Sequence, residues 1–195
     1  MRSIRLQLAV TFAALAVAAA IFAWLGLPPG KAIWDAVAKD DPCDIQRHLR
    51  WGAAEAKDEF GRSAMHWAAR FDRRSLAELL VDRGAEMNAR DKDGLAPLHT
   101  AAAYGSREVV RLLLDGGADI GPKSGNGKTP LHWAAFGGSR EVAQLLLDRG
   151  AEINATDKGG LTPLDTARLW GHASLTEFLR SRRGVSGKDL PKPAP

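Results

Sequence analysis

A spacing of 33 residues runs through most of this chain, and it limits the possible folds more than any other feature of the sequence. Four glycines mark the spacing, at Gly61, Gly94, Gly127 and Gly160, each 33 residues after the one before. The segments that follow them are alike and read GRSAMHWAARFD, GLAPLHTAAAYG, GKTPLHWAAFGG and GLTPLDTARLWG. A fixed period of this length indicates an array of small units, each built from the same local elements.

Each unit contains the signals of two short helices joined by a turn. Proline stands at the first position of the first helix in three units, at Pro97, Pro130 and Pro163, where its missing N–H costs no helix hydrogen bond. A second apolar pattern follows, such as EVVRLLLDGGADIGP, whose spacing places Val109 and Leu113 on one side of a helix. We expect the polar sequence between units, such as AEMNARDKDG, to form extended β-hairpin loops.

Neither helix of a unit buries its apolar side alone, so neighbouring units have to stack. The sequence therefore predicts an all-α solenoid over residues 31–184, with a degenerate first unit at 31–57. The four clear units occupy 58–90, 91–123, 124–156 and 157–184. We expect residues 185–195, which read VSGKDLPKPAP, to form a disordered tail.

The repeated segment resembles the signature of the ankyrin repeat family, which is T-P-L-H-x-A on a period of about 33 residues. Residues 129–134 match the signature in full, whereas Ala64, Ala96 and Asp72 depart from the family pattern and Asp165 replaces the last histidine. The resemblance implies an ankyrin-repeat solenoid of helix–turn–helix units with β-hairpin loops. It also implies that the protein binds another protein and is not an enzyme.

In the family, the hairpin tips and the exposed side of each first helix line a concave face, which implies a set of candidate partner-binding residues. These positions are rich in aromatic and basic types here, a composition typical of interface hot spots. They are Phe60, Arg62, Arg70, Phe71, Arg90, Lys92, Leu95, Tyr104, Lys123, Asn126, Lys128, Phe136, Lys158 and Trp170. The alternative is that these aromatic side chains pack between units and the basic tips are merely solvated. We expect Trp67 and Trp133 to be buried.

Two patterns suggest other chemistry but have the wrong spacing for it. His66, His99 and His132 recur every 33 residues, but helices pack about 8–10 Å apart and zinc needs its nitrogen ligands at about 2.0–2.1 Å. The run ending at Lys128 resembles a phosphate-binding loop, yet Pro122 stands where such a loop needs its first glycine. The sequence also lacks a nucleophile elbow and a His-Glu-x-x-His motif. We therefore expect no catalytic residue, no metal and no cofactor.

An uninterrupted apolar segment precedes the repeats, because residues 8–27 carry no charged side chain. As a helix it would be about 30 Å long, the thickness of a bilayer core. Arg2 and Arg5 favour a cytoplasmic N-terminus, which places the repeats on the far side of the membrane, the periplasm in a bacterium. Residues 1–30 are either an uncleaved anchor, which we favour, or a signal peptide cleaved near Ala20.

The formal net charge of +4 comes from the two ends of the chain, because residues 31–181 carry 21 basic and 22 acidic side chains. Nucleic-acid binders usually concentrate cations on one face of the domain, so we expect no nucleic acid as a partner. We expect a monomer that binds another protein and touches a membrane through its N-terminal helix. Three alternatives stay open: an enzyme with an unrecognised site, a regulator that binds anionic lipid through the basic tail at 180–192, and a soluble cytoplasmic scaffold whose N-terminal segment is not a membrane helix.

Overall fold

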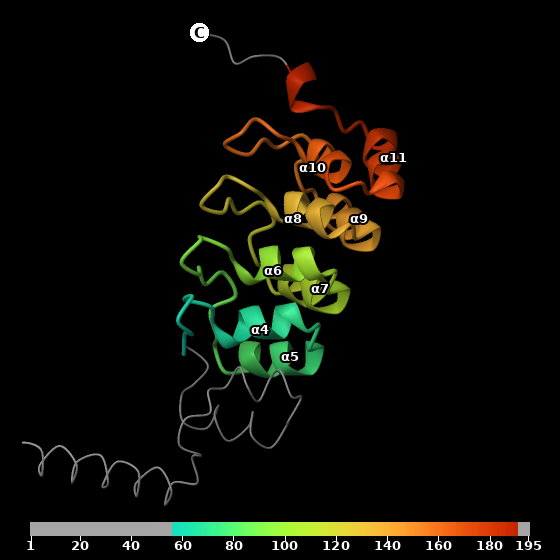
Figure 1. Ribbon diagram of the computed structural model, residues 1–195. Coiled ribbons are helices and arrows are strands. Elements are labelled where there is room, and N and C mark those ends of the chain that lie inside the picture. The colour runs from blue at the N-terminus through green and yellow to red at the C-terminus, as the bar shows by residue number, and fades with distance from the viewer. Residues whose placement is uncertain (1–55, 191–195) are drawn as a thin grey trace, which may run out of the picture. The chain divides into compact units, whose positions relative to one another are not determined.

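The computed structural model describes residues 56–190, and these residues stack as four helix pairs (Figure 1). The expected N-terminal helix at 1–30 and nearly all of the unit at 31–57 lie outside the described residues. The first helices are α4 (Ala64–Arg70), α6 (Pro97–Tyr104), α8 (Pro130–Gly137) and α10 (Pro163–Leu169). The second helices are α5 (Arg74–Asp82), α7 (Arg107–Asp115), α9 (Arg140–Asp148) and α11 (Ala173–Ser181). No helix in residues 56–190 has both the length and the apolar character needed to cross a membrane.

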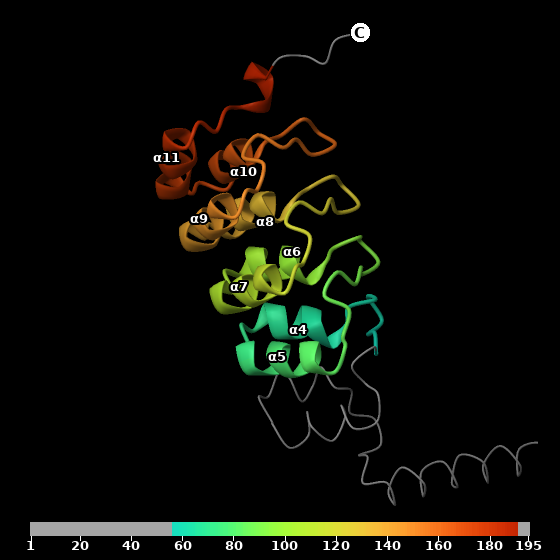
Figure 2. The ribbon, with the colours of Figure 1, turned by 180° about the vertical axis from the view of Figure 1, so that it is seen from behind.

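The first helices form one row and the second helices another, as the views from both sides show (Figures 1 and 2). Alanine pairs on the first helices are completely buried, at Ala68–Ala69, Ala101–Ala102 and Ala134–Ala135, and their small side chains allow helices to approach closely. Each second helix adds a completely buried leucine at the same repeat position, namely Leu80, Leu113, Leu146 and Leu179. Burying a leucine side chain contributes about 1.5–3 kcal/mol, so stacking stabilises each unit through its neighbours.

The motif histidines connect successive units. The ring nitrogen Nδ1 of His66, His99 and His132 accepts a hydrogen bond from the backbone N–H three residues earlier, at 3.1, 2.9 and 3.2 Å. Each Nε2 lies 3.0, 3.1 and 3.0 Å from the backbone oxygen 29 residues later, in the next unit. Because Nδ1 accepts and Nε2 faces a carbonyl, each ring is neutral and carries its proton on Nε2.

The loops between units are hairpin-like only at their tips. In one tip Asp91 N donates to Leu95 O and Gly94 N donates to Asp91 O, each at 3.0 Å, and the same pair of bonds recurs at 58–62, 124–128 and 157–161. The expectation of extended β-hairpins is wrong for the described part of the chain: no strand forms there, and an isolated bridge joins Lys57 to Ser63.

The physical reason lies in bonds between one tip and the next. Lys92 N donates to Phe60 O at 3.0 Å, Gly125 N to Asp93 O at 2.8 Å and Lys158 N to Asn126 O at 3.0 Å. The tips thus direct part of their backbone hydrogen bonding along the stack, to the tip of the next unit, and do not use it to extend a ladder between the two arms of one loop.

The segment expected to be a disordered tail is ordered over residues 185–190. Val185 N donates to Asn154 Oδ1 at 2.9 Å, Gly187 N donates to Asp165 Oδ2 at 2.7 Å, and a short 3₁₀ helix η2 spans Gly187–Asp189. Asp165 stands where the other units have histidine. In those units the histidine faces a backbone carbonyl of the next unit, whereas Asp165 accepts a hydrogen bond from a backbone N–H of the tail. Burial by itself raises the pKa of Asp165, but the hydrogen bonds from Gly187, Thr162 and Ser186 hold it below its ordinary value.

Candidate functional site

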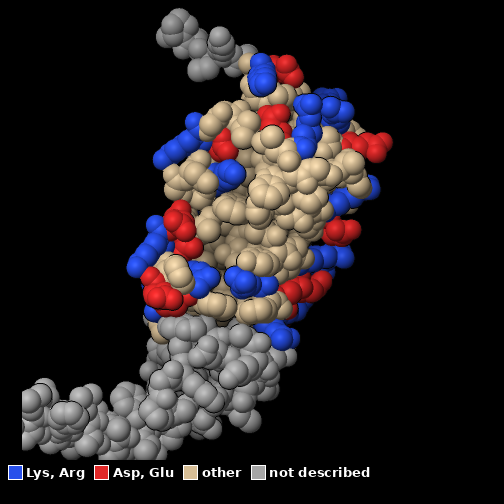
Figure 3. Space-filling view, in the orientation of Figure 1, with Lys and Arg blue, Asp and Glu red and all other residues tan. Residues whose placement is uncertain are grey.

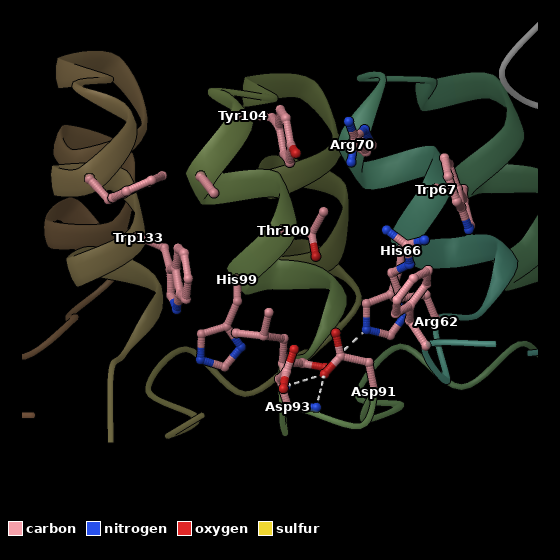
Figure 4. A pocket seen from close by; sticks show the side chains of 14 residues that line it. Arg62, His66, Trp67, Arg70, Asp91, Asp93, His99, Thr100, Tyr104 and Trp133 are labelled. Carbon is pink, nitrogen blue, oxygen red and sulfur yellow. Dashed lines mark hydrogen bonds between the residues drawn. The ribbon is translucent and has the colours of Figure 1, made fainter. Parts of the chain in front are cut away.

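A groove of about 310 Å³ runs across the first three described units, along the side that carries the first helices and the loop tips (Figure 4). Its walls come from α4, α6 and α8 and from the tips at 58–62 and 91–95. The lining side chains are Phe60, Arg62, His66, Trp67, Arg70, Asp91, Asp93, Leu95, His99, Thr100, Ala103, Tyr104, Trp133 and Phe136. Figure 3 shows a largely uncharged central surface on this side of the described units, with charged side chains gathered toward its margins.

The structure brings six of the candidate partner-binding residues together in this groove. These are Phe60, Arg62, Arg70, Leu95, Tyr104 and Phe136. Lys92 and Asn126 line a neighbouring hollow between the second and third loop tips. Phe71 stacks on Trp67 with ring centroids 5.9 Å apart, and Trp170 meets Phe136 edge-on at 4.4 Å.

The other four candidates, all basic, lie outside the groove lining. Arg90 Nη1 donates to Gly94 O at 2.7 Å and to the backbone oxygen of Lys123 at 2.9 Å, so Arg90 joins two loop tips. Lys123 and Lys158 are exposed, and Lys128 Nζ lies 5.8 Å from the centre of the Trp133 ring system.

Two arginines lie on the aromatic walls of the groove. The guanidinium of Arg70 is 4.7 Å from the Tyr104 ring centre and 5.7 Å from that of Trp67. The guanidinium of Arg62 is 4.7 Å from Phe60 and 4.5 Å from Trp67, and its Nε donates to Asp58 at 2.8 Å. Within residues 56–190, no carboxylate forms an ion pair with Arg70, whereas Arg62 is already paired.

Asp58 is nearly covered and organises the tip of the first described unit. Its Oδ1 accepts from Phe60 N and Arg62 N, both at 2.9 Å, and its Oδ2 accepts from Trp67 Nε1 at 3.2 Å. Burial raises the pKa of Asp58, but the hydrogen bonds and charge of Arg62, with the Phe60 N–H, lower it below the ordinary value. The carboxylate therefore stays ionised at neutral pH and fixes both Arg62 and the Trp67 indole.

Sequence reasoning missed Trp67 and Trp133 as groove residues, since it expected both to be buried. Both are partly exposed and line the groove. A signal was available, because Trp67 lies three residues before Arg70 and four before Phe71, a spacing that places these side chains next to one another on a helix and its end. Asp91 and Thr100, which were not among the candidates, also line the groove.

The groove offers noncovalent contacts to a ligand. The ring nitrogens of His66 and His99, which line it, are already hydrogen-bonded to the backbone. In the described residues no three side chains of the metal-binding types gather at one place. What remains is an aromatic surface that carries Arg70, the Asp58-paired Arg62 and two aspartates, a combination suited to binding a peptide segment.

Comparison with known families gives one match to this chain. A family model described as ankyrin repeats (3 copies) matches residues 33–124 and 117–189. No curated protein matches the chain.

Proposed function

Since the chain belongs to the ankyrin repeat family, we propose that its described units bind a partner protein through the groove on α4, α6 and α8. Ankyrin repeats are generally protein–protein interaction modules, and the family is typically a non-enzymatic scaffold. The proposal is therefore an interaction site without catalysis, with the concave side as the binding surface.

The observation that carries the proposal is the exposure of large apolar side chains along this side. Tyr104 is 54% exposed, Phe60 55%, Phe71 37% and Trp170 57%. Soluble proteins seldom leave neighbouring aromatic side chains in water unless a partner covers them. Aromatic residues and arginine are also the types that contribute most to binding energy at interfaces.

We propose that the partner presents an acidic surface to Arg70. This guanidinium lies on the aromatic walls formed by Trp67 and Tyr104. Because its position is already defined by these rings, a partner carboxylate can form a bidentate pair with it at a low cost in side-chain entropy.

Charge reversal at Arg70 tests whether the partner binds in the groove. The purified full chain serves as bait in affinity capture, and the dissociation constant of each captured protein is then measured with wild type and variants. We expect Arg70→Glu to weaken binding at least tenfold, about 1.4 kcal/mol, with an unchanged unfolding midpoint. Arg107→Glu, at an exposed position on α7 in the other helix row, is the matched control and should change affinity less than about twofold. Equal effects of the two reversals would show that the groove is not the binding surface.

We also propose that residues 8–27 anchor the protein in a membrane with the repeats on the far side. The support is the uncharged apolar sequence and the preceding Arg2 and Arg5. In membrane fractions washed with carbonate, an anchored chain stays in the pellet and keeps its original N-terminus. A soluble chain that begins near Ile21 would instead indicate a cleaved signal peptide and contradict the anchor.

A further inference from the structure

Loop tips of the first and third described units place different side chains around a tryptophan at the same repeat position. Asp58, Arg62 and Trp67 precede Ser124, Lys128 and Trp133 by two full periods. In the first unit Asp58 Oδ2 accepts from Arg62 Nε at 2.8 Å and from Trp67 Nε1 at 3.2 Å. One carboxylate therefore satisfies both the indole N–H and the cation.

The third unit lacks this carboxylate. The Ser124 hydroxyl, in a side chain that is buried, donates to Asn126 Oδ1 at 2.6 Å and accepts from Lys128 N at 3.1 Å. Trp133 Nε1 is buried, and no described residue accepts its hydrogen bond. Lys128 also forms no ion pair within residues 56–190. Native structures seldom leave a buried donor without an acceptor, so an unpaired indole N–H needs a physical explanation.

We propose that a carboxylate side chain of the partner protein takes the place of the missing aspartate. It accepts a hydrogen bond from Trp133 Nε1 and forms an ion pair with the Lys128 ammonium, as Asp58 does with Trp67 and Arg62 inside the chain. This inference rests on the proposed function, because the carboxylate arrives with a protein bound in the groove.

A bound segment can contact the partly exposed ring of Trp133, and its carboxylate reaches the buried Nε1 once the atoms that cover it move aside. Trp133 lines the groove formed by α4, α6 and α8 (Figure 4). Together with Ser124 and Asn126 it also lines the neighbouring hollow of about 670 Å³ between two loop tips. A segment lying along the groove therefore passes the indole and the tip that holds Lys128.

Asp91 and Asp93 limit which side chains a bound segment can carry, because both residues line the groove and the hollow. Their charges repel a run of acidic side chains in a partner. The segment that fits best carries isolated carboxylates, one held at Lys128 and Trp133 and one at Arg70, separated by apolar or neutral side chains that cover the aromatic walls.

A random peptide library selected on the purified full chain supplies a probe. We expect selected peptides to share one acidic position, and we expect its change from Glu to Gln to weaken binding to wild type at least tenfold, the range of a charge-assisted hydrogen bond. Selected peptides without an acidic residue, or equal binding of the Glu and Gln forms, would overturn the inference while leaving the groove as a binding site. An empty selection would count against the proposed function itself.

Two variants locate the carboxylate. Ser124→Asp supplies the acceptor within the chain, so the unfolding midpoint should rise by a few degrees while the Glu peptide binds at least tenfold more weakly. Trp133→Phe keeps the aromatic surface and removes the N–H, so peptide affinity should fall while the midpoint stays within a few degrees. On the Ser124→Asp background, Glu and Gln peptides should bind alike. A Ser124→Asp variant that binds the Glu peptide as wild type does would place the carboxylate elsewhere.

Discussion

Lowering the pH from about 7.5 to about 5 is expected to reduce the free energy of unfolding by about 2 kcal/mol through His99 alone. His99 is completely buried, its Nδ1 accepts from Ala96 N at 2.9 Å, and its Nε2 lies 2.9 Å from the backbone oxygen of Pro122. A proton on Nδ1 would replace that acceptor with a second donor facing a backbone N–H. Burial, together with the nearby Arg90 charge, lowers the pKa of His99 to about 4. The contacts with the carbonyls of Pro122 and Lys128 and the charge of Asp91 raise the pKa by less.

The direction of the effect follows from where the proton binds. In the unfolded chain His99 has a pKa of about 6.5, whereas in the folded protein its pKa is about 4. Acid therefore favours the unfolded state, so this stability is fully present above about pH 6.5 and is lost as the pH falls toward about 4. Burial lowers the pKa of His66 and His132 as well, so the total loss should exceed that of His99 alone. The pKa values of Asp58 and Asp165 are lowered in the folded protein, so the stability that these carboxylates contribute is lost only when the pH falls below about 4.

Urea unfolding at a series of pH values measures this dependence. The matched variant is His99→Gln, which cannot titrate, and its stability should fall less steeply than that of wild type between about pH 6.5 and about pH 4.5. Since the variant also loses hydrogen bonds, the comparison uses the slope against pH and not the absolute stability. Identical slopes in the two proteins would contradict the assignment of the acid sensitivity to His99.

The sequence was sufficient to predict the helix pairs, because their signals are local and recur in every unit. Pro130 begins α8, Gly138 ends it in the left-handed conformation, and the buried leucines follow the same spacing as the glycines. Phe71, Tyr104 and Trp170 are exposed at the C-terminal ends of the first helices, Phe71 and Trp170 as the residues directly after α4 and α10, and their role in binding stays a prediction. A single unit contains all the information that these features need.

Contacts between units could not be predicted in this way. The order of residues 185–190 depends on Asp165, which the sequence presents as a departure from the motif and whose bond to Gly187 forms only once the chain has folded back on the last unit. The missing acceptor at Trp133 likewise becomes visible when its surroundings are compared with those of Trp67 in space. Periodicity predicts what the units share, whereas a specific site arises where one unit differs from the others.

Gly137 is such a difference, and Gly137→Ala is expected to lower the free energy of unfolding by about 2–3 kcal/mol, the cost of overpacking a tight contact. The other units have an aromatic residue at this repeat position, at Phe71, Tyr104 and Trp170, while the aromatic residue of the third unit is Phe136. A Cβ atom on Gly137 would overlap the backbone oxygen of Ala103, so the absence of a side chain lets α8 lie close against α6 at this point. Backbone atoms cannot rotate away as a flexible side chain can, so one helix has to move.

Gly121→Ala is the matched control for this substitution, because a Cβ atom at Gly121 would meet no atom within 4 Å. Both variants lower the backbone entropy of the unfolded chain, which by itself stabilises a protein by about 0.4–1 kcal/mol. Urea unfolding should therefore show Gly121→Ala at or slightly above wild type and Gly137→Ala clearly below it. Because α6 and α8 carry Tyr104 and Trp133, a shift between these helices also alters the groove, so Gly137→Ala should weaken peptide binding. Wild-type stability and affinity in Gly137→Ala would show that the close approach of the two helices is not required.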